Sequence, residues 1–544
     1  MPPHLAIRPL ETNPYNGRMT PFLVLTCMVA SLGGVIFGYD IGISGTNLYL
    51  HRFSEVKFFL PIDLRKRAAK LAKFFDDPAG VMATKEASLK DMFPWLHMRM
   101  EKSSSSYCRS SSQWMSGYTA SLYVAGAMGA LVAAWVTREF GRRPTMVAGG
   151  AASLAGSILA AAGPTVWTLL LGRVLLGFGV GFANQAIPLY LSEMAPPASR
   201  GAINNVFQLS YDIGLFLADL IIFSVQRSRD SWGWRISLGM AAAPSFSLTL
   251  GALFIPETAN SIIQRDIDFH RAVKTLQTIR GTTDILAELN DIMTAGDAQV
   301  TTNQSFYRIT RCKYRPQLIM AITIPFFQQV IGFNLVAFYI PILIQNIGFG
   351  KNSFLMSALV IGLTGTTSTM VLMTIVDRIG RRAMFTIGGI QMLVSLVAVG
   401  RVMMTQLSED NEISRGYAYL ALFLVCVYLM GFGWSWGPLG WLVPSEIFPL
   451  EIRSAGQSIV VAVWFLSAFV VAETFPTLIC QLKATSFFIF GGWVTMVIIF
   501  IHLFLPETRG IAMERMDQVW KKHWLWKKTI AVEETQDDCF DDVT

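Results

Sequence analysis

The sequence predicts an all-α membrane protein with twelve transmembrane helices in two six-helix halves. Three observations lead to this prediction: the composition, the number of long apolar runs and an internal repeat of motifs. Of the 544 residues, 52% are hydrophobic and 15% are charged, and the mean hydropathy is +0.45. Soluble domains carry about 25% charged residues. The deficit extends along the whole chain, which indicates that most of the surface faces lipid.

Twelve apolar runs are long enough to cross a bilayer, which takes about 20 mostly apolar residues. They cover residues 20–46, 113–136, 144–163, 166–190, 201–224, 233–255, 317–345, 353–376, 383–405, 417–441, 455–478 and 485–505. Two long polar segments interrupt the series, and the second separates six runs from six. The expected organisation is a tail at 1–19, an N-terminal half at 20–255 containing a lid segment at 51–111, a linker at 256–315, a C-terminal half at 316–505 and a tail at 506–544.

The basic residues give the expected sidedness. The net charge is +7, and much of the Lys and Arg lies in short clusters between apolar runs and in the 256–315 linker. Cytoplasmic loops of membrane proteins carry such an excess, so both termini and the linker are expected in the cytoplasm and segment 51–111 outside. This pattern argues against nucleic-acid binding. The six cysteines form no Cys-x-x-Cys pair, which leaves a zinc or redox motif unsupported.

Three motifs occur once in each half. The string REFGRR at 138–143 corresponds to DRIGRR at 377–382, and Pro-Glu-Thr occurs at 256–258 and at 506–508. Glu193 stands seven residues before Arg200, as Glu446 does before Arg453. Each motif recurs roughly 240–250 residues later, as expected for a transporter built from an internal duplication.

The short loops of the repeat indicate a gate. Glycine lets the chain turn tightly, and paired arginines can hold acidic groups at the ends of neighbouring helices. We expect Glu193 and Glu446 to be the acids, and the basic candidates are Arg142, Arg143, Arg200, Arg381, Arg382 and Arg453. The alternative is that the arginines are ordinary anchors at headgroup level; the repeat in both halves favours the gate.

Asp40 and Arg173 form a candidate proton-coupling pair. Asp40 lies in the first apolar run and Arg173 deep in the fourth. An ionisable residue inside the membrane is costly and indicates a functional site by default. A carboxylate with a nearby cation is suited to carry a proton in a way that depends on conformation. A static buried salt bridge is the alternative.

A second group of residues is suited to bind a sugar. Sugar hydroxyls need donors and acceptors, and Gln and Asn side chains supply both. Gln328, Gln329 and Asn334 fall near one helix face, and Gln208 lies in the fifth run. Trp441, with Gly437, offers an aromatic face in the tenth run. The alternative for a single intramembrane Gln is a hydrogen bond between helices.

Longer strings carry a family resemblance. Beside the repeated motifs, these are FGYDIGISG at 37–45, YLSEMAP at 190–196, QQVIGFN at 328–334 and GPLGWLVPSEIFP at 437–449. Over residues 20–520 the chain resembles the sugar porter family of the major facilitator superfamily, and within it plant proton-coupled hexose symporters most closely. The resemblance implies the major facilitator fold and proton coupling by the Asp40 and Arg173 pair. It also implies sugar contacts by Phe37, Ile41, Gln208, Gln328, Gln329, Asn334, Gly437 and Trp441.

The resemblance further implies a disulfide between Cys108 and Cys480, which would tie the external lid to the C-terminal half. An oxidising exterior is consistent with this bond. From the residues alone, two free thiols are an equally good interpretation.

Several positions depart from the family pattern. Gly365 stands where an Asn is expected, Ala468 where a Thr is expected, and Trp464 where an Asn is expected. Losing three hydrogen bonds of about 0.5–1.5 kcal/mol each would weaken binding on the order of 10²-fold. Acids replace neutral residues at Asp212, Asp219 and Glu473, and Asp212 shares a helix face with Gln208. We therefore expect altered substrate preference or proton coupling.

The sequence thus favours a proton-coupled monosaccharide symporter, with hexose as substrate, that works by alternating access. A facilitative uniporter and a non-transporting sugar sensor are the alternatives. No catalytic triad or phosphate-binding loop is visible in the sequence, so an enzyme or an ATP-driven pump is not expected. We expect no cofactor and no metal, a functional monomer, partners limited to sugar, proton and lipid, and a multi-pass protein of the plasma membrane.

Overall fold

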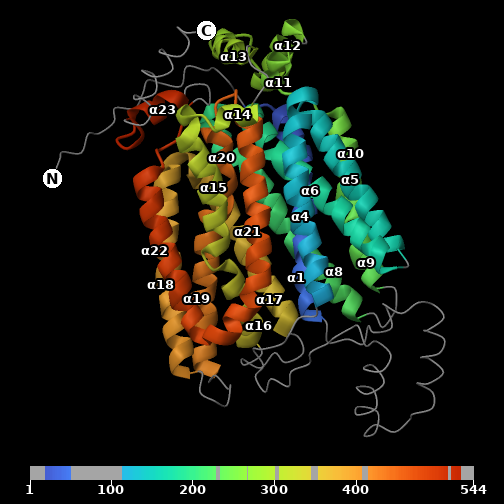
Figure 1. Cartoon of the computed structure of the whole chain (residues 1–544), viewed down its shortest axis with the longest axis vertical. Helices are drawn as coiled ribbons and strands as arrows, with labels where there is room; N and C mark the ends of the chain where they lie inside the picture. Colours follow the sequence, from blue (N-terminus) through green and yellow to red (C-terminus); the bar gives the residue numbers. More distant parts are fainter. Residues whose placement is uncertain are drawn as a thin grey trace, which may run out of the picture.

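The structure is a computed structural model of the chain. It describes residues 19–50, 113–163, 165–227, 233–265, 268–300, 305–344, 353–406, 415–511 and 516–527. Throughout these ranges the regular elements are helices, and no strand occurs among them (Figure 1). The whole of the expected lid segment, including Cys108, lies outside the described residues, and so does the side chain of Cys480. The predicted lid and disulfide therefore stay predictions.

The described residues contain twelve spans that are long and apolar enough to cross a membrane, which confirms the predicted number. In the N-terminal half, the first four spans are formed by α1, α4, α5 and α6. The fifth span contains α7 and α8, and the sixth contains α9 and α10. The bounds are α1 (Pro21–Leu50), α4 (Gln113–Phe140), α5 (Arg142–Ala162), α6 (Val166–Met194), α7 (Arg200–Asn204), α8 (Val206–Arg227), α9 (Gly233–Gly239) and α10 (Ala242–Phe254), with a 3₁₀ turn at Pro197–Ser199.

The C-terminal half follows the same plan, with the seventh and tenth spans interrupted. The bounds are α15 (Arg315–Val330), α16 (Phe333–Ile344), α17 (Ser353–Ile379), α18 (Arg381–Gln406), α19 (Arg415–Trp434), α20 (Trp436–Ile447), α21 (Arg453–Leu482) and α22 (Ser486–Phe504). Short 3₁₀ turns lie at Cys312–Tyr314 and Lys483–Thr485. The linker adds α11 (Ala259–Gln264), α12 (Phe269–Arg280), α13 (Leu286–Val300) and α14 (Ser305–Ile309), and α23 (Met516–Lys522) follows the last span.

The break in the seventh span falls beside a predicted sugar contact. Gly332 has a φ of +99°, a conformation that side-chain-bearing residues rarely adopt. The helix consequently stops after the Gln328 and Gln329 pair and restarts at Phe333. Discontinuous helices of this kind commonly form the midplane substrate sites of transporters.

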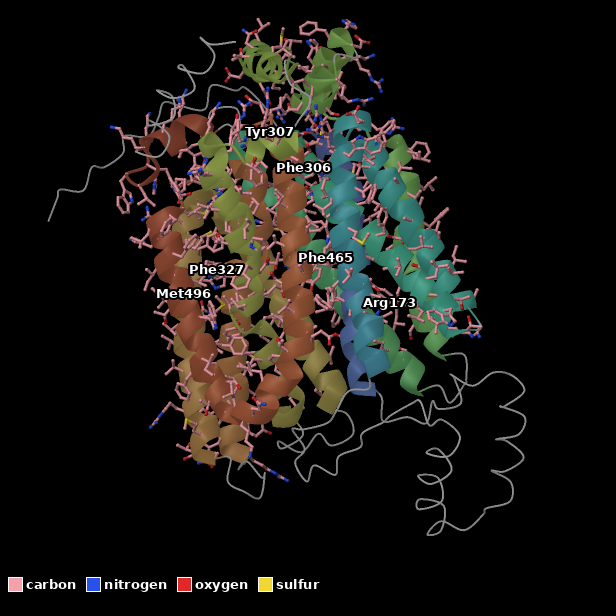
Figure 2. The ribbon with its side chains drawn as sticks, in the orientation of Figure 1. Arg173, Phe306, Tyr307, Phe327, Phe465 and Met496 are labelled. Carbon is pink, nitrogen blue, oxygen red and sulfur yellow. The ribbon has the colours of Figure 1, made fainter. Side chains whose placement is uncertain are left out.

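The two halves lie beside each other, with α11, α12 and α13 covering one end of the bundle (Figure 1). We call this end the linker end. The halves meet chiefly along α4 with α21 and α8 with α17, and smaller contacts join α6 to α20 and α21 and α7 to α17. At the first of these contacts the ring of Phe465 lies 2.9 Å from where a Cβ on Gly126 would stand, and Figure 2 shows Phe465 on α21 facing α4.

The outer surface of the bundle is apolar. Large hydrophobic side chains on four different helices are well exposed, among them Trp167 at 72%, Phe254 at 80%, Val394 at 63% and Phe423 at 62%. Exposed apolar surface on this scale marks an interaction site in a soluble protein, and here it forms the lipid-facing side of spanning helices. One buried core lies within the C-terminal half, and the other fills the N-terminal half and extends to residues of α20 and α21.

Helices α1 and α8 pack closer together than ordinary side chains allow. Gly34, Gly38 and Gly42 follow each other at four-residue spacing along α1 and face α8. A Cβ on Gly34 would lie 2.5 Å from the carbonyl oxygen of Phe207, and one on Gly38 would collide with the backbone of Tyr211. Small residues at this spacing bring membrane helices into backbone contact. Helices α1 and α8 therefore form one tightly packed pair.

Candidate functional site

Asp40 and Arg173 are brought together as predicted. Arg173 on α6 donates from Nη1 to Oδ1 of Asp40 on α1. Arg173 is only 1% exposed and Asp40 only 3% exposed. Figure 2 shows Arg173 within the N-terminal half, farther from the linker end than Phe465. Removing an ion pair from water costs several kcal/mol of desolvation per ion, and the attraction between the two charges offsets a similar amount. Because the two terms nearly balance, protonating Asp40 would change the stability of this contact.

Aromatic rings from both halves meet close to this pair. Phe37 lies one helical turn before Asp40 on α1, and its ring centroid is 6.1 Å from that of Trp441 on α20 and 5.2 Å from that of Trp464 on α21. Phe207 on α8 approaches Trp441 at 5.8 Å. These rings are at most 8% exposed. We call Phe37, Phe207, Trp441 and Trp464 the aromatic cluster; it joins the N-terminal half to the C-terminal half near the middle of the bundle.

Gln328 stands on the C-terminal side of this cluster. Its Nε2 donates to the carbonyl oxygens of Gly437 at 2.9 Å and Trp436 at 3.3 Å. Gly440 leaves room for the amide, since a Cβ there would lie 2.8 Å from it. Within the described part of the chain, the buried Oε1 of Gln328 has no hydrogen-bond partner. A buried acceptor of this kind is normally satisfied, so it is suited to accept from a ligand hydroxyl.

The other predicted polar sugar contacts differ in burial. Gln329 and Asn334 are half-buried on either side of the helix break, and Ile41 is half-buried on α1. Gln208 is 7% exposed on α8, where its Nε2 donates to Oδ1 of Asp212 at 3.1 Å.

The three substituted positions differ in their surroundings. Ala468 is buried against the aromatic cluster. Trp464 belongs to that cluster, and its indole N–H is buried without a partner among the described residues. Gly365 on α17 faces Asp212: a Cβ there would lie 3.8 Å from Cγ of Asp212. The amide and hydroxyl groups expected at these positions are thus replaced by aromatic surface, a methyl group and open space beside a carboxylate.

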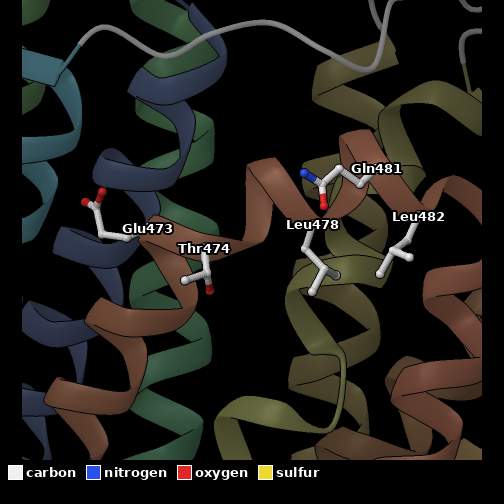
Figure 3. A pocket seen from close by; sticks show the side chains of 5 residues that line it. All are labelled: Glu473, Thr474, Leu478, Gln481 and Leu482. Carbon is white, nitrogen blue, oxygen red and sulfur yellow. The ribbon is translucent and has the colours of Figure 1, made fainter.

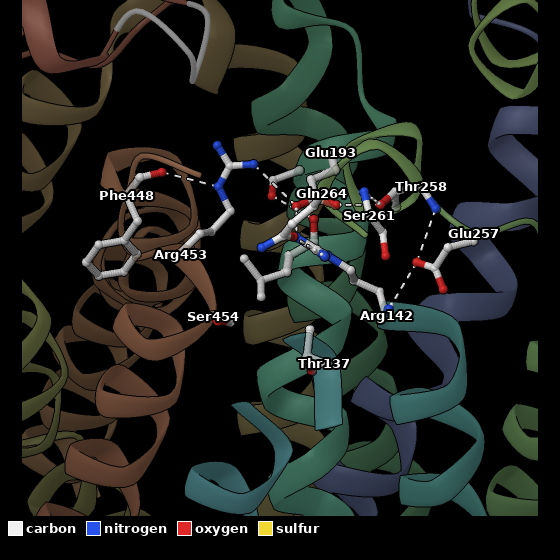
Figure 4. A network of polar contacts seen from close by, with 12 residues as sticks. Thr137, Arg142, Glu193, Glu257, Thr258, Ser261, Gln264, Phe448, Arg453 and Ser454 are labelled. Atoms are coloured by element: carbon white, nitrogen blue, oxygen red, sulfur yellow. Dashed lines mark hydrogen bonds and ion pairs between the residues drawn. The ribbon is translucent and has the colours of Figure 1, made fainter. Parts of the chain in front are cut away.

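The gate residues of the N-terminal half form a buried network at the linker end (Figure 4). Arg142 at the start of α5 donates to Glu193 at 2.8 Å, and Thr258 donates to the other oxygen of Glu193 at 2.6 Å. Arg453 on α21 reaches across from the C-terminal half to Glu193 at 3.3 Å. Glu193 therefore holds residues of both halves in one charged cluster.

The proline–glutamate–threonine motif caps the helix that follows the Gly-Arg-Arg turn. Oε1 and Oε2 of Glu257 each accept a backbone N–H, from Arg142 and Arg143 respectively, both at 3.0 Å. The first N–H groups of a helix have no partner within it, and a carboxylate there is favoured by the helix dipole. The turn brings the carboxylate close because Gly141 has a φ of +96° and no Cβ, which would lie 2.5 Å from Glu257.

The C-terminal half repeats this arrangement. Glu507 caps the start of α18 through the N–H groups of Arg381 and Arg382, at 2.9 and 3.1 Å. Glu446 binds Arg381 at 2.8 Å and accepts from Thr508 at 2.8 Å. The sequence repeat is therefore a repeat of contacts.

Three of the predicted gate arginines donate to backbone carbonyl oxygens. Arg143 and Arg382 use their side chains on carbonyl oxygens at the ends of α10 and α22, those of Leu253 and His502. Arg200 donates to the carbonyl oxygen of Ile511, 3.1 Å away, in the segment after the last span.

Sequence reasoning missed Asp377 as a link between the halves. Its Oδ1 and Oδ2 accept the backbone N–H groups of Gly201 and Ala202 at the start of α7, at 3.1 and 3.0 Å. The signal was present in the repeat, because Asp377 stands where the other half has Arg138. Two further contacts cross at this end, from Asn204 to Ser445 at 3.0 Å and from Gln185 to the carbonyl of Ser454 at 3.4 Å. The halves are thus fastened together at the linker end.

A groove of about 390 Å³ opens near the other end of α21 (Figure 3). Its lining is Glu473, Thr474, Leu478, Gln481 and Leu482. Glu473 is exposed here and does not belong to the aromatic cluster. This acid therefore lies outside the predicted sugar site.

Two helical halves around a buried polar centre define a multi-pass membrane protein with the two-half architecture of a membrane transporter. A family model described as "Sugar (and other) transporter" matches residues 26–520. The chain belongs to this family of sugar transporters.

Related proteins match almost end to end. The chain is 51% identical to the hexose carrier protein HEX6 of Ricinus communis over 97% of each chain. It is 46% identical to sugar transport protein 3 of Arabidopsis thaliana over 96% of each chain. Among solved structures, a proton:xylose symporter of the major facilitator superfamily, XylE, bound to 6-bromo-6-deoxy-D-glucose, has a TM-score of 0.73 at 22% identity; the match covers 93% of this chain and all of that one. The fold is therefore that of the major facilitator superfamily, as the sequence predicted.

Proposed function

We propose that the protein is a proton-coupled monosaccharide symporter that takes hexoses into the cell. The observation that carries the proposal is the buried Asp40 and Arg173 pair, which lies one helical turn from Phe37 of the aromatic cluster. A uniporter needs no titratable pair beside its substrate site. The relatives named as hexose and sugar transport proteins support the substrate class.

The proposed cycle begins with the linker end closed and facing the cytoplasm. A proton reaching Asp40 from outside neutralises it and weakens its hold on Arg173. Because α1 is packed against α8 without intervening side chains, both helices move together, and Phe37 closes on a sugar held by Gln328 and Trp441. The closing of this side is coupled to the opening of the linker end, where Glu193 releases Arg453.

Release completes the cycle. With the linker end open, Asp40 loses its proton to the cytoplasm and pairs with Arg173 again, which favours return to the starting state. The membrane potential contributes about 2.3 kcal/mol per charge per 100 mV to each proton carried inward. We place the protein in the plasma membrane, where such a gradient exists, and expect each monomer to complete the cycle alone.

The test is sugar accumulation by the purified protein in liposomes, with an inward proton gradient and with a protonophore. The wild type should concentrate hexose above its external level, and the protonophore should abolish this. Asp40→Asn should bind and exchange sugar but reach an internal-to-external ratio of only about one, since the gradient no longer drives it. Asp268→Asn is the matched control, because this exposed aspartate caps α12 in the linker.

The alternatives give different results. Equilibration without accumulation in the wild type would identify a uniporter, and binding without flux would identify a sensor. Accumulation that persists in Asp40→Asn would remove Asp40 from the proton path.

A further inference from the structure

Asp212 joins the two halves, and the proposed proton cycle does not use it. It follows Tyr211, whose ring centroid lies 5.0 Å from that of Phe37 in the aromatic cluster. It lies on α8 in the N-terminal half and is 9% exposed. Its Oδ1 accepts from Nε2 of Gln208 at 3.1 Å, and its Oδ2 accepts from Oγ1 of Thr369, on α17 of the C-terminal half, at 2.7 Å. Asp212 is therefore held in one orientation by one donor from each half.

Gly365 and Asp212 are complementary in size. Gly365 lies one helical turn before Thr369 on α17, and its missing Cβ would stand 3.8 Å from Cγ of Asp212. A Cβ at 365 would be in ordinary van der Waals contact with the carboxylate, so a longer side chain there would have to share its space with Asp212. At this point the carboxylate on α8 is the polar group present, in place of one on α17.

The carboxylate also decides which way Gln208 points. In the structure both oxygens of Asp212 accept hydrogen bonds, which is the behaviour of an ionised carboxylate, an acceptor-only group with about four lone-pair sites on its two oxygens. Gln208 must therefore turn its NH₂ group to Asp212, which leaves its Oε1 as the group it can offer to a ligand. Each oxygen of Asp212 also keeps acceptor capacity after its one bond. Asp212 and Gln208 together consequently present hydrogen-bond acceptors, whereas a Gln side chain without this partner can present both a donor and an acceptor.

We propose that Asp212 is a specificity-determining residue that, with Gln208, requires one hydroxyl of the monosaccharide to donate a hydrogen bond. The proposal rests on the proposed function in that it assumes a monosaccharide bound at the aromatic cluster. It names the substrate feature that this chain selects: a hydroxyl at one ring position that cannot be replaced by an acceptor-only group.

Analogue binding tests this feature without depending on proton coupling. The purified protein binds radiolabelled glucose, and unlabelled deoxy- and fluoro-glucoses, substituted at one position at a time, displace it. A fluorine can accept weakly but cannot donate. At the position facing Asp212, the deoxy and fluoro analogues should therefore bind equally poorly, each roughly 10- to 100-fold weaker than glucose, because hydrogen bonds to charged groups are among the stronger ones.

Asp212→Asn is the matched variant, because it keeps the shape and removes the charge. Asparagine offers an NH₂ group as well as an acceptor, and it lets Gln208 turn its own NH₂ toward the sugar. The fluoro analogue at that one position should regain affinity relative to the deoxy analogue, with the other positions unchanged. A purely structural role for Asp212 would lower the affinity for all analogues alike.

A second pair of variants tests complementarity. Gly365→Asn alone should weaken glucose binding because the new side chain is crowded by the carboxylate, and Asp212→Thr alone should weaken it by replacing the carboxylate with a single hydroxyl. The double variant Asp212→Thr/Gly365→Asn should bind glucose more tightly than the product of the two single fold-losses in affinity predicts, as expected for residues in contact.

The outcomes separate this proposal from the proposed function. Glucose binding with an analogue profile that is the same in the wild type and Asp212→Asn would overturn the role of Asp212 and leave the transporter assignment intact. Strictly additive losses in the second set would overturn the complementarity with Gly365. Failure of every monosaccharide to bind the folded wild-type protein would overturn the proposed function and this inference with it.

Discussion

The glutamate of each Pro-Glu-Thr motif caps a helix in its own half. Glu257 and Glu507 each neutralise a helix start with two backbone N–H bonds. The sequence predicted that the Gly-Arg-Arg turns would hold acids, and in the structure Glu193 lies against Arg142 and Glu446 against Arg381. It did not predict the caps, because the glutamate is more than a hundred residues from the turn and only the fold brings them together.

At the residue scale, His523 should make the end of the chain sensitive to pH. It follows α23, whose Trp520 is fully buried, and neither ring nitrogen of His523 has a hydrogen-bond partner among the described residues. Burial and the nearby Arg382 lower its pKa below the usual value. A lowered histidine pKa means that the undocked segment binds more protons, so docking is fully stable above about pH 6.5 and weakens as the pH falls from there toward the lowered pKa.

Hydrogen exchange of the peptide 516–527 measures this effect. Protection, corrected for intrinsic exchange, should be lower at pH 5.5 than at pH 7.5 in the wild type and equal at both in His523→Gln. An equal decrease in the variant would assign the sensitivity to another group.

At the scale of elements, the number of spans could be predicted and their interruptions could not. Twelve apolar runs follow from composition alone. The breaks before α8, α16 and α20 follow from contacts that a hydropathy pattern does not contain, such as the turn at Gly332 against Phe490. The same limit applies to helix starts: runs were expected from 144 and 383, whereas α5 and α18 begin at Arg142 and Arg381 because the glutamate caps make a charged first turn stable.

The α1–α8 contact yields a prediction about this pair of elements. Gly38→Ala places a methyl group against the Tyr211 backbone, which cannot yield as a flexible side chain would. Overpacking of this kind costs about 1–3 kcal/mol, and the melting temperature of the purified protein should fall accordingly. Gly416→Ala in α19 is the control, since nothing lies within 4 Å of its Cβ position. Equal melting temperatures for the two variants would mean that the α1–α8 pair can separate easily.

At the scale of the whole molecule, the repeat is symmetric in contacts within each half and asymmetric in contacts between halves. Glu193 is bound by Arg453 from the other half, whereas among the described residues Glu446 forms its salt bridge with Arg381 of its own half. The return link is made instead by Asp377 with the start of α7. The internal repeat predicted a gate in each half. Which acid links the two halves could not be predicted, because that depends on how the halves pack against each other.

This asymmetry predicts unequal effects of two matched substitutions on the linker end. Glu193→Gln leaves Arg142 and Arg453 buried without their carboxylate, and breaking a buried pair in this way costs about 3–5 kcal/mol. That cost falls on the closed state, in which Arg453 is held, so the equilibrium should shift toward an open linker end. Glu446→Gln also disturbs a buried arginine, but Arg381 keeps its bond to Asp377 at 3.0 Å, and no salt bridge between the halves is lost.

The measurement is the labelling rate of a cysteine at Gln185→Cys by a water-soluble maleimide, with the native cysteines removed. Gln185 is fully buried beside Ser454 at the junction of the halves. Labelling should be slow in the parent and in Glu446→Gln and at least about 10-fold faster in Glu193→Gln, because each 1.4 kcal/mol changes the open population tenfold. Equally fast labelling in both glutamate variants would show that both clusters close the linker end, and slow labelling in both would assign the closure to Asp377 and the backbone contacts of α7.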